Sequence, residues 1–260
     1  MNKELYKNIF KRKSFHLFRN RNEETISKDD IKEIVDTYNS FTPLVENIKT
    51  EIKIVKGEET SCKRGEEYCI LFFSEKKDHY LQNIGYLGEL LDLYLVNKNI
   101  GTLWFGIAKS NEVYHGLDYV IMMGIAKMDE DKFRKDMYKA KRKELADIWQ
   151  GDDLGIGNIV RFTPSACNSQ PWLVTNKDNI LTVYRKSKSG KVGIMPKNAA
   201  VYFNQIDIGI FLAFLDLCLD NKNIKYERTV YIDNQSFDEP VKYAEYRLSF
   251  LENIADSYLT

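Results

Sequence analysis

The sequence lacks an excess of charge of either sign, because its 260 residues include 38 Lys and Arg and 38 Asp and Glu. A surface that coats nucleic acid needs a clear basic excess, so the balance argues against a nucleic-acid partner. It leaves room for a local cationic pocket. Long apolar runs are also missing. The longest, Ile206–Leu219, carries two aspartates and is shorter than the roughly 18–20 residues that cross a bilayer, so no membrane span is expected.

Signals for export and for metal binding are scarce as well. Met1–Glu4 opens a polar stretch without the apolar core of a secretion signal, so we expect a cytoplasmic protein. There are only three histidines, and the four cysteines form no CxxC pair. These scattered residues make a poor set of metal ligands. We interpret all four thiols as ordinary and mainly structural: Cys62, Cys69, Cys167 and Cys218.

Three familiar site motifs are absent. The segment Gly155-Ile156-Gly157 continues as Asn158-Ile159-Val160, so the GxGxxG fingerprint of dinucleotide-binding folds does not occur. Neither GxxxxGKS nor GxxxxGKT is present, which excludes a standard phosphate loop. Ser165 and Ser169 lack a GxSxG context, which argues against a serine nucleophile of the α/β-hydrolase type.

The chain contains an internal repeat. A shift of 124 residues lays Ile84–Ile100 on Ile208–Ile224, with 10 of 17 positions identical. Both segments are apolar, free of proline and typical of buried helices. A shift of 121 residues lays Phe41-Thr42-Pro43 on Phe162-Thr163-Pro164, and Asn47 on Asn168. Chance likeness between two amphipathic helices is the alternative, but the matching order and spacing of two separate blocks favour a repeat.

Each copy predicts the same order of elements. In the first, Ser27 and Asp30 form a capping-box pattern ahead of a helix. Helices are expected near 28–38 and 80–98, and strands near 51–55, 68–73, 102–107 and 119–126. In the second, helices are expected near 152–161 and 203–221, and strands near 172–175, 180–185, 226–232 and 242–249. We divide the chain into residues 1–128, a charged connecting helix at 129–150, and residues 151–260, all in one compact body.

Two short segments carry candidate chemistry. After a short N-terminal helix, Arg12, Lys13, Ser14 and His16 offer the charge-assisted donors that a phosphate monoester binds, although a solvated basic turn would read the same way. The second segment, Pro164–Trp172, is restrained by a proline near each end. Its polar groups could meet the edge of a flat heteroaromatic ring, or the segment could simply be a turn that opens a strand.

These segments resemble the signatures of the flavin-dependent nitroreductase family. Arg12-x-Ser14-x-His16 is similar to its N-terminal Arg-x-Ser-x-basic pattern, and Pro164–Trp172 is similar to its more specific Pro-Ser-x-x-Asn-x-Gln-Pro-Trp pattern. Residues 99–106 resemble the family's Gly-Leu-Gly-Thr-x-Trp-Ile-Gly turn. The resemblance covers essentially the whole chain, and it implies an α+β fold that normally forms an intertwined homodimer with FMN at the interface.

The sequence departs from that pattern because each half keeps one signature. The first half has the phosphate signature, but its second signature is reduced to Pro43–Lys49. The second half keeps the second signature only. The chain therefore resembles a single-chain branch of the family, in which two fused halves form a pseudo-dimer of antiparallel sheets around long central helices. One composite FMN site and a monomeric protein are the expectation.

The resemblance also implies roles for individual residues. Arg12 and Ser14 would hold the phosphate, with help from Lys13, and His16 would lie near the pyrimidine side of the flavin. Gly106 and Ile107 match the turn whose backbone faces the reactive ring nitrogen. The loop from the other half contributes Ser165, Ala166, Asn168 and Gln170. A basic pair after the last strand corresponds to Lys141-Arg142-Lys143, with Arg142 as the candidate, although an ordinary charged helix face is equally compatible.

The implied activity is an FMN-dependent NAD(P)H oxidoreductase. Because no separate nicotinamide-binding fold is present, NADH or NADPH and a flat small-molecule electron acceptor would use the same flavin face in turn. That predicts ping-pong kinetics without an obligatory acid or base side chain. Cys167 is not expected to be catalytic. A flavin carrier or sensor with little turnover, and a pseudoenzyme built for protein contact, are the alternatives.

Overall fold

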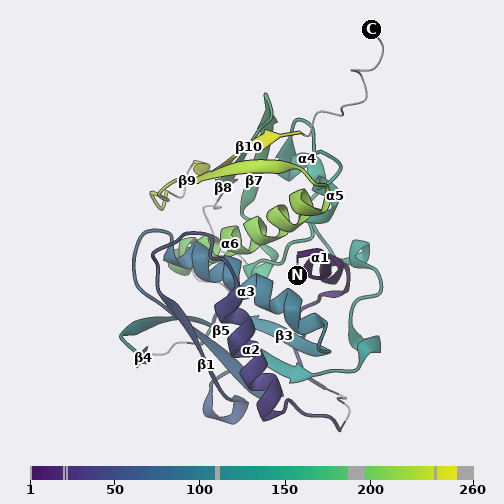
Figure 1. The fold of residues 1–260 in the computed structure, drawn as a ribbon, viewed down its shortest axis with the longest axis vertical. Helices are drawn as coiled ribbons and strands as arrows, with labels where there is room; N and C mark the ends of the chain where they lie inside the picture. The colour runs from purple at the N-terminus through teal and green to yellow at the C-terminus, as the bar shows by residue number, and fades with distance from the viewer. Residues whose placement is uncertain are drawn as a thin grey trace.

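Two antiparallel sheets enclose a pair of long helices. A computed structural model describes residues 2–19, 21, 23–108, 112–186, 197–236 and 239–250. In Figure 1 the layers follow one another from the lower sheet through α3 and α6 to the upper sheet. This arrangement confirms the expected mixed α+β fold with antiparallel sheets and long central helices.

The first sheet and its helices come from residues 2–127. The helices are α1 (Asn2–Lys11), α2 (Lys28–Ser40), α3 (Tyr80–Val96) and the 3-10 turn η1 (Gly57–Glu59). The strands are β1 (Thr50–Lys56), β2 (Tyr68–Ser74), β3 (Ile100–Phe105), β4 (Val113–Tyr114) and β5 (Leu117–Lys127). They pair in the order β1-β2-β5-β3, with β4 also on β5. The capping box of α2 is confirmed, since the Asp30 N–H donates to Ser27 and the Ser27 N–H to Asp30.

The second sheet comes from residues 149–249. Its strands are β6 (Trp149–Gln150), β7 (Trp172–Lys177), β8 (Ile180–Arg185), β9 (Lys225–Val230) and β10 (Val241–Ser249). The order is β6-β7-β8-β10-β9, and β6 alone pairs in parallel. The accompanying helices are α4 (Leu145–Ile148), α5 (Gly157–Val160), η4 (Ala166–Asn168) and α6 (Lys197–Asn221).

The connecting helix expected at 129–150 is wrong, and the helix expected near 152–161 forms only over a short part of that range. Residues 129–150 contain only the turns η2 (Glu130–Lys132) and η3 (Met137–Lys139), then α4 and β6. The backbone of this segment bonds to other parts of the chain, as where the Arg134 N–H donates to the Lys11 carbonyl. In residues 152–161 only α5 is helical. Asp152 and Asp153 accept from the backbone of Leu154 and Gly155, both with left-handed φ, which ends any helix there.

The central helices touch at two glycines. A Cβ on Gly85 would lie 2.1 Å from the Ile206 carbonyl oxygen, and one on Gly209 would lie 1.9 Å from that of Gln82. Only glycine permits so close a backbone approach. The apolar segment Ala199–Asn221 is long enough to cross a membrane, contrary to expectation. However, 89% of its most apolar stretch is buried within the protein, so packing against α3, α1 and the second sheet accounts for its composition.

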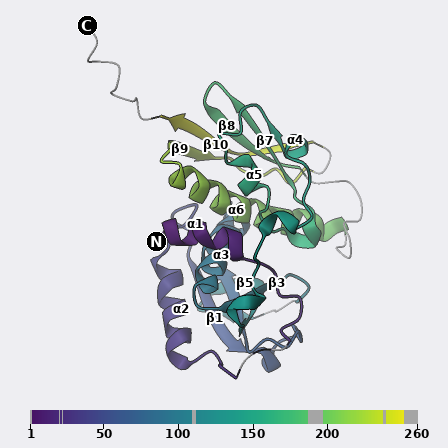
Figure 2. The ribbon, with the colours of Figure 1, turned by 90° about the vertical axis from the view of Figure 1, so that its right-hand side faces the viewer.

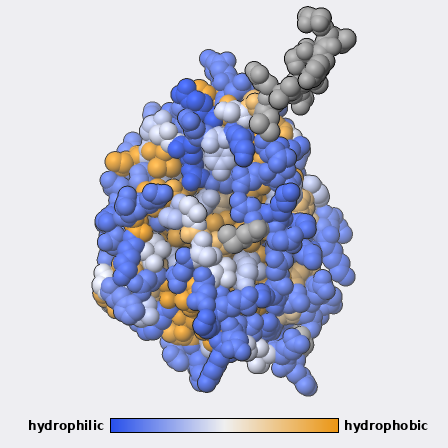
Figure 3. Space-filling view, viewed as in Figure 1, coloured by the Kyte–Doolittle hydropathy of each residue, from blue (hydrophilic) through white to orange (hydrophobic). Residues whose placement is uncertain are grey.

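Helix α1 packs against both central helices. It lies against both α3 and α6, which Figure 2 shows from the side, and the Asn8 side chain donates to the Leu93 carbonyl. Its C-terminal end therefore delivers Arg12 to the centre of the molecule. The face in Figure 3 is mainly hydrophilic, with small groups of hydrophobic residues.

Candidate functional site

Arg12 lies buried against two acids of α3. Its Nε is 2.9 Å from Asp92 Oδ2 and 3.4 Å from Glu89 Oε1, and its Nη2 donates to Ser14 Oγ at 3.3 Å. Thr102 of β3 donates to the other Asp92 oxygen at 2.6 Å. Burial, together with the charge of Asp92, raises the pKa of Glu89 well above its usual range. Asp92, the nearer of the two acids, is the main counterion of Arg12.

Four arginines gather around this point, and we call Arg12, Arg134, Arg142 and Arg161 the arginine cluster. Burial, then the charges of the other three, lowers the pKa of Arg142 to about 10. Burial and Arg12 likewise lower the pKa of Arg134. Across the described part of the chain, neither Arg134 nor Arg142 forms an ion pair with a carboxylate. The cluster therefore holds more positive charge than its surroundings neutralise.

Arg142 connects the cluster to the loop Pro164–Gln170. Its Nη1 donates to Asn168 Oδ1 and its Nη2 to the Phe162 carbonyl, both at 3.1 Å. The Lys143 N–H donates to Gln170 Oε1 at 2.8 Å, and Arg161 Nη1 donates to the Lys143 carbonyl at 3.0 Å. The Nε atoms of Arg142 and Arg161 are buried and have no hydrogen-bond partner. Two guanidinium groups thus keep unused donors inside a cationic region.

The same loop has a strained backbone. The backbone φ angles of Cys167, Asn168 and Gln170 are 50°, 53° and 48°, values that residues other than glycine rarely adopt. The loop is held in place because the Gln170 N–H donates to Ser165 Oγ and the Ala166 N–H to Asp207 Oδ1, each at 2.9 Å. Such strain persists where the surroundings enforce it, and it concentrates at ligand-binding segments.

The remaining expected residues lie around these segments. Burial, then Arg134, lowers the pKa of Lys13, so this side chain belongs to the same cationic region. The backbone of Ser14 pairs with that of Thr102 of β3 in an isolated parallel β-bridge. At the end of that strand, a Cβ on Gly106 would lie 2.6 Å from the Phe203 ring of α6. His16 and Ile107 are exposed, and no hydrogen bond or ion pair among the described residues ties either one to the cluster.

The structure thus brings together Arg12, Lys13, Ser14, Arg142, Asn168 and Gln170, with Ser165 and Ala166 shaping the loop. Sequence reasoning missed Arg134 and Arg161. Arg134 lay inside the segment interpreted as a helix, and Arg161 stood just before the repeated Phe-Thr-Pro block. Asp207 was also missed, although the 124-residue shift places it opposite Asn83, whose side chain accepts from the Val45 N–H.

Arg134 also lines two pockets beside the cluster. One of about 340 Å³ is formed with Lys135, Asp136, Lys139 and Ala140. The other, of about 620 Å³, shares Arg134 and Lys135 with the first and is otherwise lined by Lys11, Glu130, Asp131 and Phe133. Small molecules can therefore reach the cluster from the side of Arg134.

Asp207 should make stability depend on pH. Burial raises its pKa to about 7, although the Ala166 N–H and Ser169 oppose this shift. The folded protein therefore keeps a proton that the unfolded chain releases above about pH 4. Stability should fall as pH rises from about 4 to 7, at up to about 1.4 kcal/mol per pH unit for this group. Asp207→Asn should flatten that slope in urea unfolding at several pH values. An unchanged slope would contradict the assignment, and Asp220→Asn serves as the exposed control.

The comparisons with known proteins bear on the family and the fold. Residues 4–218 match the sequence profile of the family described as "Putative TM nitroreductase". The crystal structure of a "putative nitroreductase" from Thermotoga maritima has the same fold, with 17% identity, a TM-score of 0.57, and coverage of 94% of this chain and 93% of that one.

Two further crystal structures match about half of the chain. One is a "Putative NADH dehydrogenase/NAD(P)H nitroreductase" from Bacteroides thetaiotaomicron, with 13% identity, a TM-score of 0.41, and coverage of 53% of this chain and 92% of that one. The other is a nitroreductase family protein from Clostridium novyi, with 18% identity, a TM-score of 0.39, and coverage of 50% and 92%. No curated protein resembles the chain closely enough to count as a match. Because the family profile runs from α1 into α6, over well more than half of this chain, the chain belongs to this nitroreductase-like family.

Proposed function

We propose that the protein is an FMN-dependent NAD(P)H oxidoreductase that reduces a flat small-molecule acceptor. The observation that carries the proposal is the partly buried arginine cluster, whose charge is not balanced, at the junction of the two signature segments. A phosphate monoester brings nearly two negative charges and three acceptor oxygens, so it complements both the excess charge and the unused Nε donors.

Each residue then has a defined task. Arg134, Arg142 and Arg161 would hold the phosphate, because Arg12 is already neutralised by Asp92. Arg12 instead positions Ser14 beside β3. The strained loop would present Asn168 and its neighbours to the ring edge. Bound FMN would supply the redox chemistry, accepting electrons from NADH or NADPH and passing them to the acceptor.

We further propose that the two halves form a pseudo-dimer within one chain. The strand order β1-β2-β5-β3 recurs as β7-β8-β10-β9. The two glycine contacts between α3 and α6 are reciprocal, since Gly85 and Gly209, like Gln82 and Ile206, are separated by 124 residues. Reciprocal contacts of this kind are typical of a two-fold interface.

Backbone details support the same equivalence. Asn47 and Asn168 both have left-handed φ angles, of 65° and 53°, as do Asn99 and Asn223 after the central helices, at 52° and 57°. An interface that is already satisfied within the chain needs no second copy. We therefore propose a cytoplasmic monomer.

A second cofactor site is not part of the proposal. The residue equivalent to Asp92 is Asp216, which accepts hydrogen bonds from Arg228, Tyr86 and Tyr246. Arg228 also donates to the Leu44 carbonyl, within the reduced second signature. A single arginine neutralised by its aspartate leaves no surplus charge for a phosphate.

Replacing Arg142 by alanine tests the proposal. The wild-type protein should carry FMN or bind it when it is added, which its visible absorption spectrum reports. Loss of one charge-assisted phosphate contact should weaken FMN binding by about 10- to 100-fold in a fluorescence titration. Arg247→Ala, at an exposed position on β10, is the matched control and should bind like wild type.

Reduction by NADH or NADPH tests the activity. Under anaerobic conditions, either donor should bleach the bound flavin, and an added quinone or nitroaromatic should restore its colour. A protein that stays colourless with added FMN would overturn the proposal. Bound flavin that neither donor bleaches would instead identify a carrier or sensor.

A further inference from the structure

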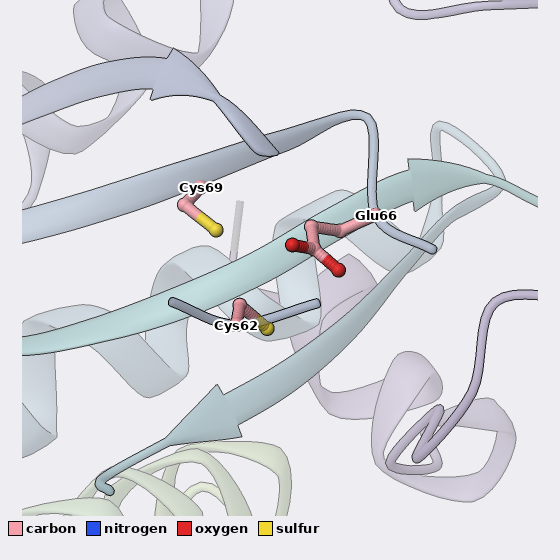
Figure 4. Close-up of side chains that lie close together, drawn as sticks. All are labelled: Cys62, Glu66 and Cys69. Carbon is pink, nitrogen blue, oxygen red and sulfur yellow. The ribbon is translucent and has the colours of Figure 1, made fainter. Parts of the chain in front are cut away.

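Two thiols and a carboxylate meet on the first sheet, away from the arginine cluster. Cys69 belongs to β2, and Cys62 and Glu66 belong to the loop before that strand (Figure 4). One sulfur or oxygen atom from each lies within 4.8 Å of the others. Both cysteines are buried, at 3% and 0% exposure, and neither is in a disulfide.

We propose that Cys62, Glu66 and Cys69 form a binding site for a thiophilic divalent cation such as Zn²⁺. Zinc takes thiolate and carboxylate ligands at about 2.3 Å and 2.0–2.2 Å in tetrahedral geometry. Those bond lengths place neighbouring tetrahedral ligand atoms about 3.5–4 Å apart. The observed grouping therefore needs only a small contraction, and the fourth position is left for water.

The surroundings already fix these ligands. The backbone N–H groups of Lys63 and Arg64 donate to the two Glu66 oxygens at 3.0 and 2.6 Å, which holds the carboxylate in the loop. Gly124 of β5 makes room for the site, because a Cβ there would lie 3.2 Å from Cys62 Sγ. Outer contacts that orient ligands in this way strengthen metal sites.

The donor set also differs from that of an ordinary buried thiol. Cys218 sits in the apolar core, where burial alone raises the pKa of its thiol. Cys62 and Cys69 also pack in an apolar cluster, but they share their position with a carboxylate, and Thr60 Oγ1 lies 3.3 Å from Cys69 Sγ. Two sulfurs facing a carboxylate suit a cation better than they suit an apolar core.

Metal binding would stiffen a loop that touches the N-terminal segment. The Phe18 N–H donates to the Arg64 carbonyl at 2.9 Å, and the Arg64 guanidinium lies 5.8 Å from the centre of the Phe105 ring. The site therefore supports the chain between Ser14 and Phe18 on one side and the end of β3 on the other. Its proposed role is structural, and it does not depend on the proposed oxidoreductase activity.

Zinc titration of the reduced, full-length protein tests the site. After treatment with a chelator and a phosphine reductant, the protein should take one equivalent of Zn²⁺ from a chromophoric chelator. Two thiol protons should be released as the metal–sulfur bonds form. Cys69→Ser and Cys62→Ser should weaken binding by about 100-fold or more, because each removes a thiolate ligand. Cys167→Ser, which removes the exposed thiol, is the matched control and should bind like wild type.

Cobalt provides a readout that needs no variant. Co²⁺ added to the wild-type protein should give thiolate-to-metal absorption and the visible bands of a tetrahedral site, and Zn²⁺ should displace both. Absence of binding under reducing conditions, or binding that Cys167→Ser abolishes, would overturn the proposal. So would a Cys62–Cys69 disulfide in freshly purified protein that persists when Zn²⁺ is present during purification.

Discussion

Arg12→Ala should lower the free energy of unfolding by about 3–5 kcal/mol, because it leaves a buried acid without its counterion. The guanidinium lies 2.9 Å from Asp92 and 3.4 Å from Glu89, and all three side chains are almost fully buried. Asp92 is the nearer acid, so it would lose its closest counterion. Urea unfolding at neutral pH, followed by circular dichroism, measures the loss.

A paired variant separates charge from packing. In Arg12→Ala/Asp92→Asn the buried charge is gone, so much of the lost stability should return. FMN binding should be weaker than in wild type in both the single and the double variant, because Arg12 also positions Ser14. A loss under 1 kcal/mol in the single variant would mean that the Arg12–Asp92 pair is not buried in solution.

Most of the regular elements could be predicted because their signals are local. The apolar runs that form β2, β5, α3 and α6 extend over many residues. A run of that length identifies the element even where its first and last residues are uncertain. The repeat added a second, independent indication, since an element found in one half was expected in the other. Ser27 and Asp30 fixed the start of α2 within a single turn.

The candidate site could be predicted only where its residues form a motif. Arg12, Asn168 and Gln170 lie in contiguous signatures. Arg134 and Arg161 belong to no motif and join the cluster only because the chain folds them against Arg142. The charged segment 129–150 looks helical by composition alone, yet its backbone bonds elsewhere and β6 pairs with β7. Tertiary contacts decided the conformation there.

The group of Cys62, Glu66 and Cys69 was missed for a related reason. Sequence spacing of the cysteines gave no metal pattern, and the carboxylate that completes the set was not considered. The ligands converge because the loop turns back, with a left-handed φ of 51° at Lys63 and 87° at Gly65. Such turns depend on backbone conformations that composition does not reveal.

Gly85→Ala and Gly209→Ala should each lower the free energy of unfolding by about 3 kcal/mol, because either methyl group would strike backbone on the opposing helix. The new Cβ would lie 2.1 Å from the Ile206 oxygen or 1.9 Å from the Gln82 oxygen, and a backbone carbonyl cannot rotate aside as a side chain can. The helices would have to separate, exposing the apolar layer between the two sheets. Thermal and urea unfolding measure both variants.

The stability losses of Gly85→Ala and Gly209→Ala should also be similar to each other. If α3 and α6 meet across a pseudo-two-fold axis, the two glycines make the same contact and the two losses should agree within about 1 kcal/mol. Gly116→Ala is the control, since nothing lies within 4 Å of the added Cβ. Any loss there reflects its φ of 82°, a backbone penalty that Gly85 and Gly209 in their helices do not carry. A large loss in one central variant with little change in the other would contradict the symmetric arrangement, because the two helices would then not contribute equally to their contact.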